Sequence, residues 1–432
     1  MPKIANIKQN TSTAYTPFAY AVDAIELTTH DGTIIGIDNF VTEFSFEESI
    51  DKLGIMATFK IKDVINMLET YQFCGQEKLN VKLSRQEHED GDFDEINLDF
   101  IVTSYPVYGK DTENSAQAYV MKAVSPHIYY GQLKQISRAF DELTVKEITR
   151  IFAEELNFTN VVQLGKCASK FQGVYPSRTP LETIKWLKRH SYTSQIDPFM
   201  VYATIAGDIR ISSLAELLKQ TSHGTYVKSN SYSAAPNTAE SYAEQKHRIL
   251  TISSNLKMGK LGQAMKGVFG STHNYVDLST KKVSTSSFTY SKLNESQSLI
   301  DTDWDRGDGK TLEDTEAYVR WRVVDDMIFD TDHTLINRTA QRNNPKRLAK
   351  LGSMEAYEHE IEIAGDFNVH PGTIITINIP KAGDRKALEE SEPLDEMLSG
   401  DYLVTAVVHS FKEEYRSGLR LKRNICPIDL NE

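Results

Sequence analysis

Apolar and polar residues alternate along both ends of the chain, and this alternation predicts antiparallel β-strands. Toward the C-terminal end, a clear run of alternation follows the turn pair Pro371-Gly372, and the later residues are rich in β-branched and aromatic side chains. Alternation interrupted by Gly and Pro is typical of strands joined by turns. We therefore predict four strands, with a turn at Ser417-Gly418 before the last one: 358–363, 373–379, 401–411 and 419–423.

The first 125 residues have the same pattern. Residues 1–17 are polar and are expected to form an arm. Alternation is strict where Phe40, Thr42, Phe44 and Phe46 share one parity. The pattern predicts one short helix at 64–71 and strands at 22–29, 33–37, 40–49, 55–61, 79–83, 96–105 and 119–124. Short strands at this density predict a small barrel or sandwich.

The middle of the chain changes to helical periodicity after Pro126. Two helix starts have the Thr-x-x-Glu spacing of a capping box, at Thr144 to Glu147 and at Thr179 to Glu182. In a capping box the Thr and Glu side chains satisfy free backbone amides of the first turn. Residues 199–211 have the pattern of a hairpin that turns on Gly207-Asp208. These signals predict a compact α+β domain over residues 126–215.

The remainder of the middle is less regular. Residues 221–247 are polar and are expected to connect domains, and residues 249–256 predict a strand. Residues 259–300 are rich in Gly, Ser, Thr and Lys, whereas residues 311–351 have the strongest helical pattern in the chain. Residues 259–350 thus combine these two kinds of sequence and lie between the α+β part and the last β unit.

Two turns share four identical residues. Gly-Thr-Ile-Ile follows Asp31 and recurs after Pro371, each time where a turn meets a predicted strand. Because the two surrounding units are both acidic and both rich in strands, the shared turn indicates an internal duplication.

Composition and charge limit the classes of function. The net charge is −12, and acidic ends, residues 1–125 and 351–432, flank a mildly basic middle. Acidic surfaces repel phosphate, so tight non-specific nucleic-acid binding is not expected at the ends. No stretch is long and apolar enough for a membrane helix, and the first residues lack the apolar core of a secretory signal. Three isolated cysteines, Cys74, Cys167 and Cys426, fit a reducing compartment.

Candidate chemical motifs are incomplete. The acidic series Asp301, Asp303, Asp305 lacks the Gly and Glu of a calcium-binding EF-hand loop. Gly309-Lys310-Thr311 lacks the first Gly of a phosphate-binding loop. A basic cluster on the second predicted helix is either a solvated face or a site for phosphate or a partner: Arg178, Lys185, Lys188, Arg189 and His190.

Histidines give no metal or acid–base motif either. His370 and His409 are expected to approach one another across the last β unit, where a structural role is favoured over a metal or acid–base pair. Catalytic carboxylate pairs leave no sequence motif, so the absence of motifs does not by itself exclude catalysis. We predict no catalytic, cofactor-binding or metal-binding residue, no cofactor, and a protein that is not an enzyme.

The order of these parts resembles a known family. A stretch from Lys122 to Ile148 introduces the α+β part, a helix reads SRTPLETIKWLKRHSY from Ser177, and the chain closes with LSGDYLVTAVVHSF and LRLKRN from Leu398. The sequence is similar to baseplate hub proteins of contractile-tailed bacteriophages, which include the T-even-type hub, phage late control D proteins and the hub part of VgrG spikes. The resemblance covers most of the chain from Val22 to Asn424, except for residues 259–350.

The resemblance implies a β-rich α+β fold with two tube-protein-like antiparallel β-barrel domains, between which lie an α+β domain and a helical insertion. The implied parts are a first barrel with the arm, the α+β domain, a connection with a strand of the second barrel, the insertion, and the second barrel: 1–125, 126–222, 223–258, 259–350 and 351–432. Fused spikes continue into further domains, so a separate spike protein is expected here.

The implied function is assembly in a phage tail baseplate. Three chains would form a pseudo-sixfold ring that joins the hexameric tail tube to a trimeric central spike. The implied partners are two other copies of the chain, the tail tube ring, the spike and the wedge proteins of the baseplate. DNA would pass through the ring without specific binding, and no membrane insertion is expected. The protein would be assembled in the cytoplasm of the host bacterium and located in the virion.

Two alternatives stay open. One is the hub of a non-phage contractile injection system that resembles type VI secretion, in which the passage carries protein effectors. The other is a tail-associated cell-wall hydrolase or glycan-binding protein, with its chemistry in residues 259–350. Genome context would distinguish the first alternative, and zymography on peptidoglycan the second.

Overall fold

The structure is a computed structural model that describes most of the chain. The described residues are 17–86, 93–111, 116–158, 160–168, 170–191, 193, 197–228, 239–256, 260–277, 281–289, 309, 318–324, 336–355, 357–381, 394–395 and 398–423.

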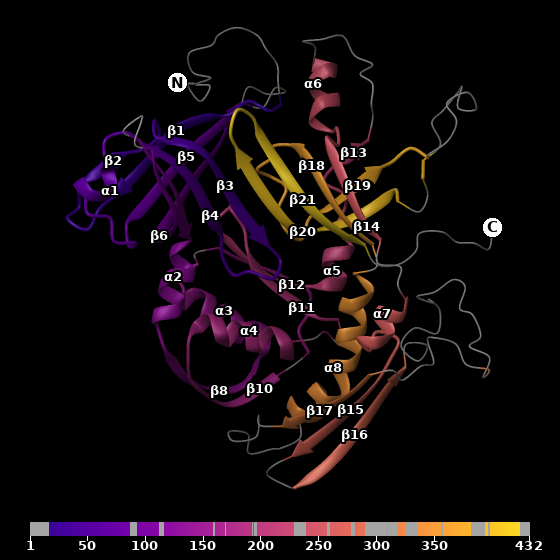
Figure 1. The fold of residues 1–432 in the computed structure, drawn as a ribbon. Coiled ribbons are helices and arrows are strands. Elements are labelled where there is room, and N and C mark those ends of the chain that lie inside the picture. Colours follow the sequence, from indigo (N-terminus) through magenta and orange to yellow (C-terminus); the bar gives the residue numbers. More distant parts are fainter. Residues whose placement is uncertain are drawn as a thin grey trace.

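Thirteen strands form one large sheet, and strands from both ends of the chain contribute to it (Figure 1). The N-terminal unit supplies β1 (Ala21–Thr28), β2 (Ile34–Gly36), β3 (Val41–Ser49), β4 (Met56–Asp63), β5 (Lys78–Gln86), β6 (Phe93–Asp111) and β7 (Ala116–Val124). The C-terminal unit supplies β13 (Thr225–Val227), β14 (Thr251–Leu256), β18 (Tyr357–Ala364), β19 (Ile374–Asn378), β20 (Gly400–Phe411) and β21 (Tyr415–Arg423).

The strand order joins the two units directly. It runs β14-β18-β21-β20-β3-β4-β7-β6-β5-β1-β2, while β19 pairs with β20 and β13 pairs with β19. All pairings in this sheet are antiparallel except β13 with β19. Strand β20 thus pairs with β3, about 360 residues earlier in the chain, and we call this pairing the seam.

The prediction of two closed barrels is wrong. Among the described residues no sheet closes on itself, and the N-terminal run of strands stops at β2. In the C-terminal unit only an isolated bridge, between Val227 and Arg248, links β13 toward the start of β14. The reason is the seam, because β3 and β20 pair with each other and not with the edge strands of their own units.

Two local predictions also need correction. A bulge between Val41 and Glu43 shifts the parity of β3, so Val41 points inward together with Phe44 and Phe46. The predicted turn at Ser417-Gly418 lies instead inside β21, and the chain reverses over the charged residues 412–414. Ser417 is buried there, and its hydroxyl is satisfied by a hydrogen bond that it accepts from the amide of Asp366 (3.2 Å).

The α+β part follows the N-terminal unit. It contains α2 (Pro126–Leu133), β8 (Ile136–Thr144), α3 (Val145–Glu155), β9 (Asn160–Leu164), β10 (Lys170–Arg178), α4 (Pro180–His190), β11 (Phe199–Ala203), β12 (Asp208–Ser213) and α5 (Leu214–Leu218). Both predicted capping boxes are present, at the starts of α3 and α4. The predicted hairpin is also present as β11 and β12, with Gly207 at a φ of 78° in its turn. A core of its own packs α3 and α4 against β11 and β12.

The rest of the chain departs more from the sequence prediction. The remaining helices are the short α1 (Met67–Thr70), α6 (Ala239–Lys246) and α7 (Lys260–Met265) and the long α8 (Ile336–Ser353). A separate three-stranded sheet contains β15 (Gly270–Asp277), β16 (Lys282–Thr289) and β17 (Tyr318–Val324). The predicted helical segment 311–351 thus contains β17, whose β-branched and aromatic residues pair with β15. The predicted connection at 221–247 contains β13 and α6.

Figure 1 shows α8 beside the three-stranded sheet, below the large sheet. None of the helices in the described part of the chain is long and apolar enough to cross a membrane.

Candidate functional site: the seam between the two β units

The seam is built from strands that alternate inward and outward residues. Ala406 of β20 lies opposite Ser49 of β3, and the register continues to Phe411 opposite Phe44. The inward residues are aromatic, and the ring of Phe411 stacks on that of Phe44 with centroids 4.6 Å apart. Phe411 also stacks on Tyr415 of β21, with centroids 4.4 Å apart. The apolar core of the N-terminal unit therefore extends into the C-terminal unit.

A fully buried carboxylate follows these aromatic residues on the inward side. Glu48 of β3 accepts a hydrogen bond from Nε2 of His409 on β20 (3.0 Å). It accepts another from the backbone N–H of Ile205, in the turn between β11 and β12 (2.7 Å). Nδ1 of His370 lies 3.6 Å from the same Glu48 oxygen as His409, too far for a hydrogen bond. Glu48 thus connects β3, β20, the segment before β19 and the α+β part.

Glu48 is ionised in spite of its burial. Burial disfavours the charge, but the two histidines outweigh it and lower the pKa of Glu48 to about 2. Because the carboxylate can only accept hydrogen bonds, Nε2 of His409 carries the proton between them. Nδ1 of the same ring lies 2.8 Å from the hydroxyl of Tyr415, within hydrogen-bond distance. Burial raises the pKa of Tyr415 well above its usual value, which keeps this hydroxyl neutral.

A second buried acid lies close by. Asp366 pairs with Nε2 of His223 (3.4 Å) and accepts a hydrogen bond from the amide of Asn368 (2.9 Å). Burial opposes its charge, but these hydrogen bonds and the nearby Arg85 lower the pKa of Asp366 to about 2. Arg85 of β5 is itself buried, and its guanidinium donates to the hydroxyl of Tyr242 on α6 (3.3 Å). Polar contacts therefore join the two units at β5 as well as at the seam.

The outward face of the sheet carries charges of both signs in neighbouring rows. Arg420 on β21 pairs with Glu360 on β18 (2.9 Å), and Lys60 on β4 pairs with Glu43 on β3 (3.0 Å). Arg416 on β21 also lies 3.5 Å from Glu362. These cross-strand pairs neutralise part of the charge on the outward face around the seam.

The structure places the predicted candidate residues as follows. His370 and His409 both reach Glu48, so the seam brings them together through a carboxylate. On α4, Lys185 and Arg189 are exposed. Nζ of Lys188 forms an ion pair with Oδ1 of Asp51, which lies two residues after the end of β3 (3.0 Å). The acidic series at Asp301 to Asp305 lies outside the described residues. No group of His, Cys, Asp and Glu that could hold a metal ion is present among the described residues.

Sequence reasoning missed Glu48, Asp366 and Arg85. Only Glu48 left a signal, because it has the same parity as Phe44 and Phe46 in β3. A carboxylate on the apolar face of a strand needs a buried partner. The position of that partner, however, depends on which strand pairs with β3.

This arrangement is suited to assembly. The side chains of Glu48 and His409 have no solvent exposure, so a dissolved substrate cannot reach them. Because Glu48 on β3 accepts hydrogen bonds from β20 and from the turn after β11 at once, it favours one relative placement of the two units and the α+β part.

Comparison with known proteins gives structural matches only. No protein-family model and no curated protein matches the sequence. A tail protein from Neisseria meningitidis MC58 aligns over 94% of this chain and 97% of its own, with a TM-score of 0.53 and 10% identity. The 43 kDa tail protein of prophage MuSo2 from Shewanella oneidensis aligns over 93% and 100%, with a TM-score of 0.51 and 10% identity.

A component of the type VI secretion system from E. coli aligns over 90% of this chain and 74% of its own at 9% identity, but its TM-score of 0.40 is too low to establish a shared fold. The two tail proteins match along nearly their whole length, as the resemblance in the sequence predicted. The chain therefore has the fold of these tail proteins.

Proposed function

We propose that the protein is a structural hub of a phage tail baseplate, where it joins the tail tube to the central spike. The observation that carries the proposal is the seam, through which two strand-rich units of one chain form a single sheet. The seam belongs to a chain whose fold matches tail proteins over nearly its full length.

The proposal includes a homotrimer. Two β units in each chain give six units in a trimer, which matches a sixfold tube on one side and a threefold spike on the other. A ring closed by one repeated contact needs rotational symmetry. The open ends of the large sheet at β14 and β2 support this proposal, because unpaired strand edges are suited to pairing with another chain.

In the proposed ring the outward face of the sheet lines a passage for DNA. A passage that DNA must leave again should not bind it tightly, and a basic surface would. The charge balance around the seam, where Arg416, Arg420 and Lys60 are paired with carboxylates, fits this requirement. The role is structural, and its partners are the tube ring, the spike and the wedge proteins.

The mass of the protein in solution tests the proposal. Light scattering behind size-exclusion chromatography should give about three times the chain mass of 48.8 kDa. Negative-stain images should then show rings with threefold symmetry. A protein that stays monomeric at high concentration, and also when mixed with its tube and spike proteins, would contradict the proposal.

A further inference from the structure

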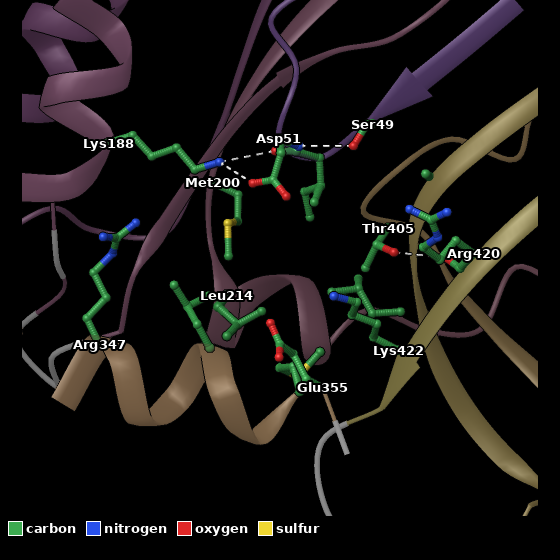
Figure 2. A pocket seen from close by; sticks show the side chains of 15 residues that line it. Ser49, Asp51, Lys188, Met200, Leu214, Arg347, Glu355, Thr405, Arg420 and Lys422 are labelled. Atoms are coloured by element: carbon green, nitrogen blue, oxygen red, sulfur yellow. Dashed lines mark hydrogen bonds and ion pairs between the residues drawn. The ribbon is translucent and has the colours of Figure 1, made fainter. Parts of the chain in front are cut away.

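A pocket of about 240 Å³ lies where both β units, the α+β part and α8 meet (Figure 2). Ser49 at the end of β3 lines it together with Ile50 and Asp51, and Lys188 of α4 reaches it from the α+β part. Helix α8 and the residues after it form one side, while β20 and β21 form the other. The pocket thus lies at the end of the seam where the chain leaves β3.

The pocket has an apolar floor. The floor residues come from four elements or the residues beside them, and all but Leu351 are buried: Met200, Leu214, Leu351, Met354 and Leu403. An apolar floor that is open to water favours a ligand with aliphatic side chains, because burial of apolar surface is favourable.

The charges around the floor leave an excess of positive charge. Both lining carboxylates already have a cation, since Asp51 pairs with Lys188 (3.0 Å) and Glu355 pairs with Lys266 (2.9 Å). Lys422 of β21 also lines the pocket and has no ion pair among the described residues (Figure 2). Burial lowers the pKa of Lys188, so its ammonium lacks full solvation. A carboxylate brought to this pocket would therefore meet partly unsatisfied positive charge.

The segment that follows β21 has the matching chemistry. Strand β21 ends at Arg423, one residue after Lys422, and the sequence continues as Asn-Ile-Cys-Pro-Ile-Asp-Leu-Asn-Glu over residues 424–432. This segment combines three aliphatic residues with the acidic Asp429 and Glu432. Pro427 cannot donate a ladder hydrogen bond, so the segment is not suited to extend β21 as a regular strand.

We propose that residues 424–432 bind in this pocket of their own chain, with aliphatic side chains on the floor and an acidic side chain at Lys422 and Lys188. The short tether supports this occupant over a free peptide, because a tethered ligand has an effective concentration of about millimolar. In this position the segment would hold α8, α4 and β21 together at the end of the seam. The inference does not depend on the proposed role in a baseplate.

Hydrogen exchange of the full chain tests the proposal. Backbone amides in residues 424–432 should exchange about tenfold more slowly in the wild type than in Lys422→Glu, which repels the acidic segment. Lys412→Glu makes the same charge change in the turn between β20 and β21, away from the pocket, and should leave the exchange unchanged. Exchange at the rate of an unstructured peptide in the wild type would overturn the proposal and leave the pocket open to another partner.

Disulfide trapping tests where residues 424–432 bind. In a chain with Cys74→Ser and Cys167→Ser, the natural Cys426 should form a disulfide with Met354→Cys on the pocket floor under mild oxidation, detected by peptide mass spectrometry. Thr42→Cys, exposed at the other end of β3, is the control and should not react. Equal reaction at both positions, or none at Met354→Cys, would show that the segment is not bound in the pocket. Mixtures of isotope-labelled and unlabelled chains should give links within one chain only, and links between chains would overturn binding within its own chain.

Discussion

Glu48 is the residue on which the two β units and the α+β part converge. Glu48 has no solvent exposure, accepts one hydrogen bond from His409 and one from the amide of Ile205, and has His370 nearby. An uncharged side chain of the same shape would leave these donors without a negative partner. Loss of one member of a buried charged pair is usually costly, whereas exposed ion pairs contribute little.

Glu48→Gln should therefore lower the free energy of unfolding by about 3 kcal/mol. Chemical denaturation at neutral pH, followed by tryptophan fluorescence, measures this change. Glu47→Gln is the matched control, because Glu47 is the preceding residue and forms a half-exposed ion pair with Lys52 (2.7 Å). Its effect should stay within about 1 kcal/mol. Similar losses in both variants would show that Glu48 does not hold the seam.

His359, on β18, should make the stability of the fold depend on pH. Its ring lies between the hydroxyls of Ser254 (2.8 Å) and Tyr402 (3.0 Å), and burial together with the charge of Arg423 lowers its pKa to about 4. In the unfolded chain the pKa returns to its ordinary value of about 6.5. Between these values only the unfolded state takes up the proton, so stability falls as the pH falls.

The free energy of unfolding should thus decrease by about 3 kcal/mol between pH 7 and pH 4 on account of His359. Urea denaturation at pH 7, 5.5 and 4 measures the slope. His359→Gln keeps a polar group between the two hydroxyls but cannot titrate, so its slope in this window should be smaller. An unchanged slope would mean that another group causes the dependence.

At the scale of elements, the two Gly-Thr-Ile-Ile turns have the same sequence but different neighbouring atoms. Gly32 and Gly372 both adopt a left-handed conformation, with φ of 85° and 88°, and each lies two residues before the start of a strand, β2 and β19. The space around them differs, because a Cβ at Gly32 would meet no atom within 4 Å. At Gly372 it would collide with the hydroxyl of the buried Tyr202 on β11.

Gly32→Ala should cost about 1 kcal/mol, since it adds only the strain of a side chain in the left-handed region. Gly372→Ala should cost about 3 kcal/mol, because the collision with Tyr202 is added to the same strain. Thermal or chemical unfolding of the two variants side by side gives the difference. Equal costs would indicate that the contact between β11 and the turn before β19 is loose.

Sequence patterns predicted the elements best where a local signal sufficed. The capping boxes at Thr144 and Thr179 need only neighbouring residues, and both are present. The segment 311–351 was predicted less well, because the pairing of β17 with β15 joins residues that are distant in the sequence. Bulges and turns, such as the bulge after Val41, depend on the partner strand and had no clear signal of their own.

At the scale of the whole molecule, the open edge at β14 is the feature on which the proposed trimer depends. Its exposed residues are short and uncharged, Thr251, Ser253, Ser254 and Asn255, and they do not include the lysines that often protect a free strand edge. An edge of this kind is suited to pairing with another chain. We expect it to take part in the contact between copies in the proposed trimer.

Two lysines at this edge, in the double variant Ser253→Lys with Asn255→Lys, should therefore shift the mass of the particle from a trimer to a monomer. The control is Thr285→Lys with Ser287→Lys on β16, which is an edge strand of the separate three-stranded sheet and should leave the trimer intact. Mass photometry at several concentrations measures both. A trimer that survives the β14 variant would place the contact elsewhere.

The sequence by itself determined the local features: strands at both ends, the capped helices of the α+β part and the absence of a recognisable chemical motif. These features follow from the side chains of nearby residues and from the period of the alternation. The tertiary structure alone decided that β3 pairs with β20, that Glu48 meets His409 there, and that the two units form one open sheet and not two barrels. A strand's alternation specifies which face is buried, but not which other strand lies beside it, and that choice depends on the packing of the complete chain.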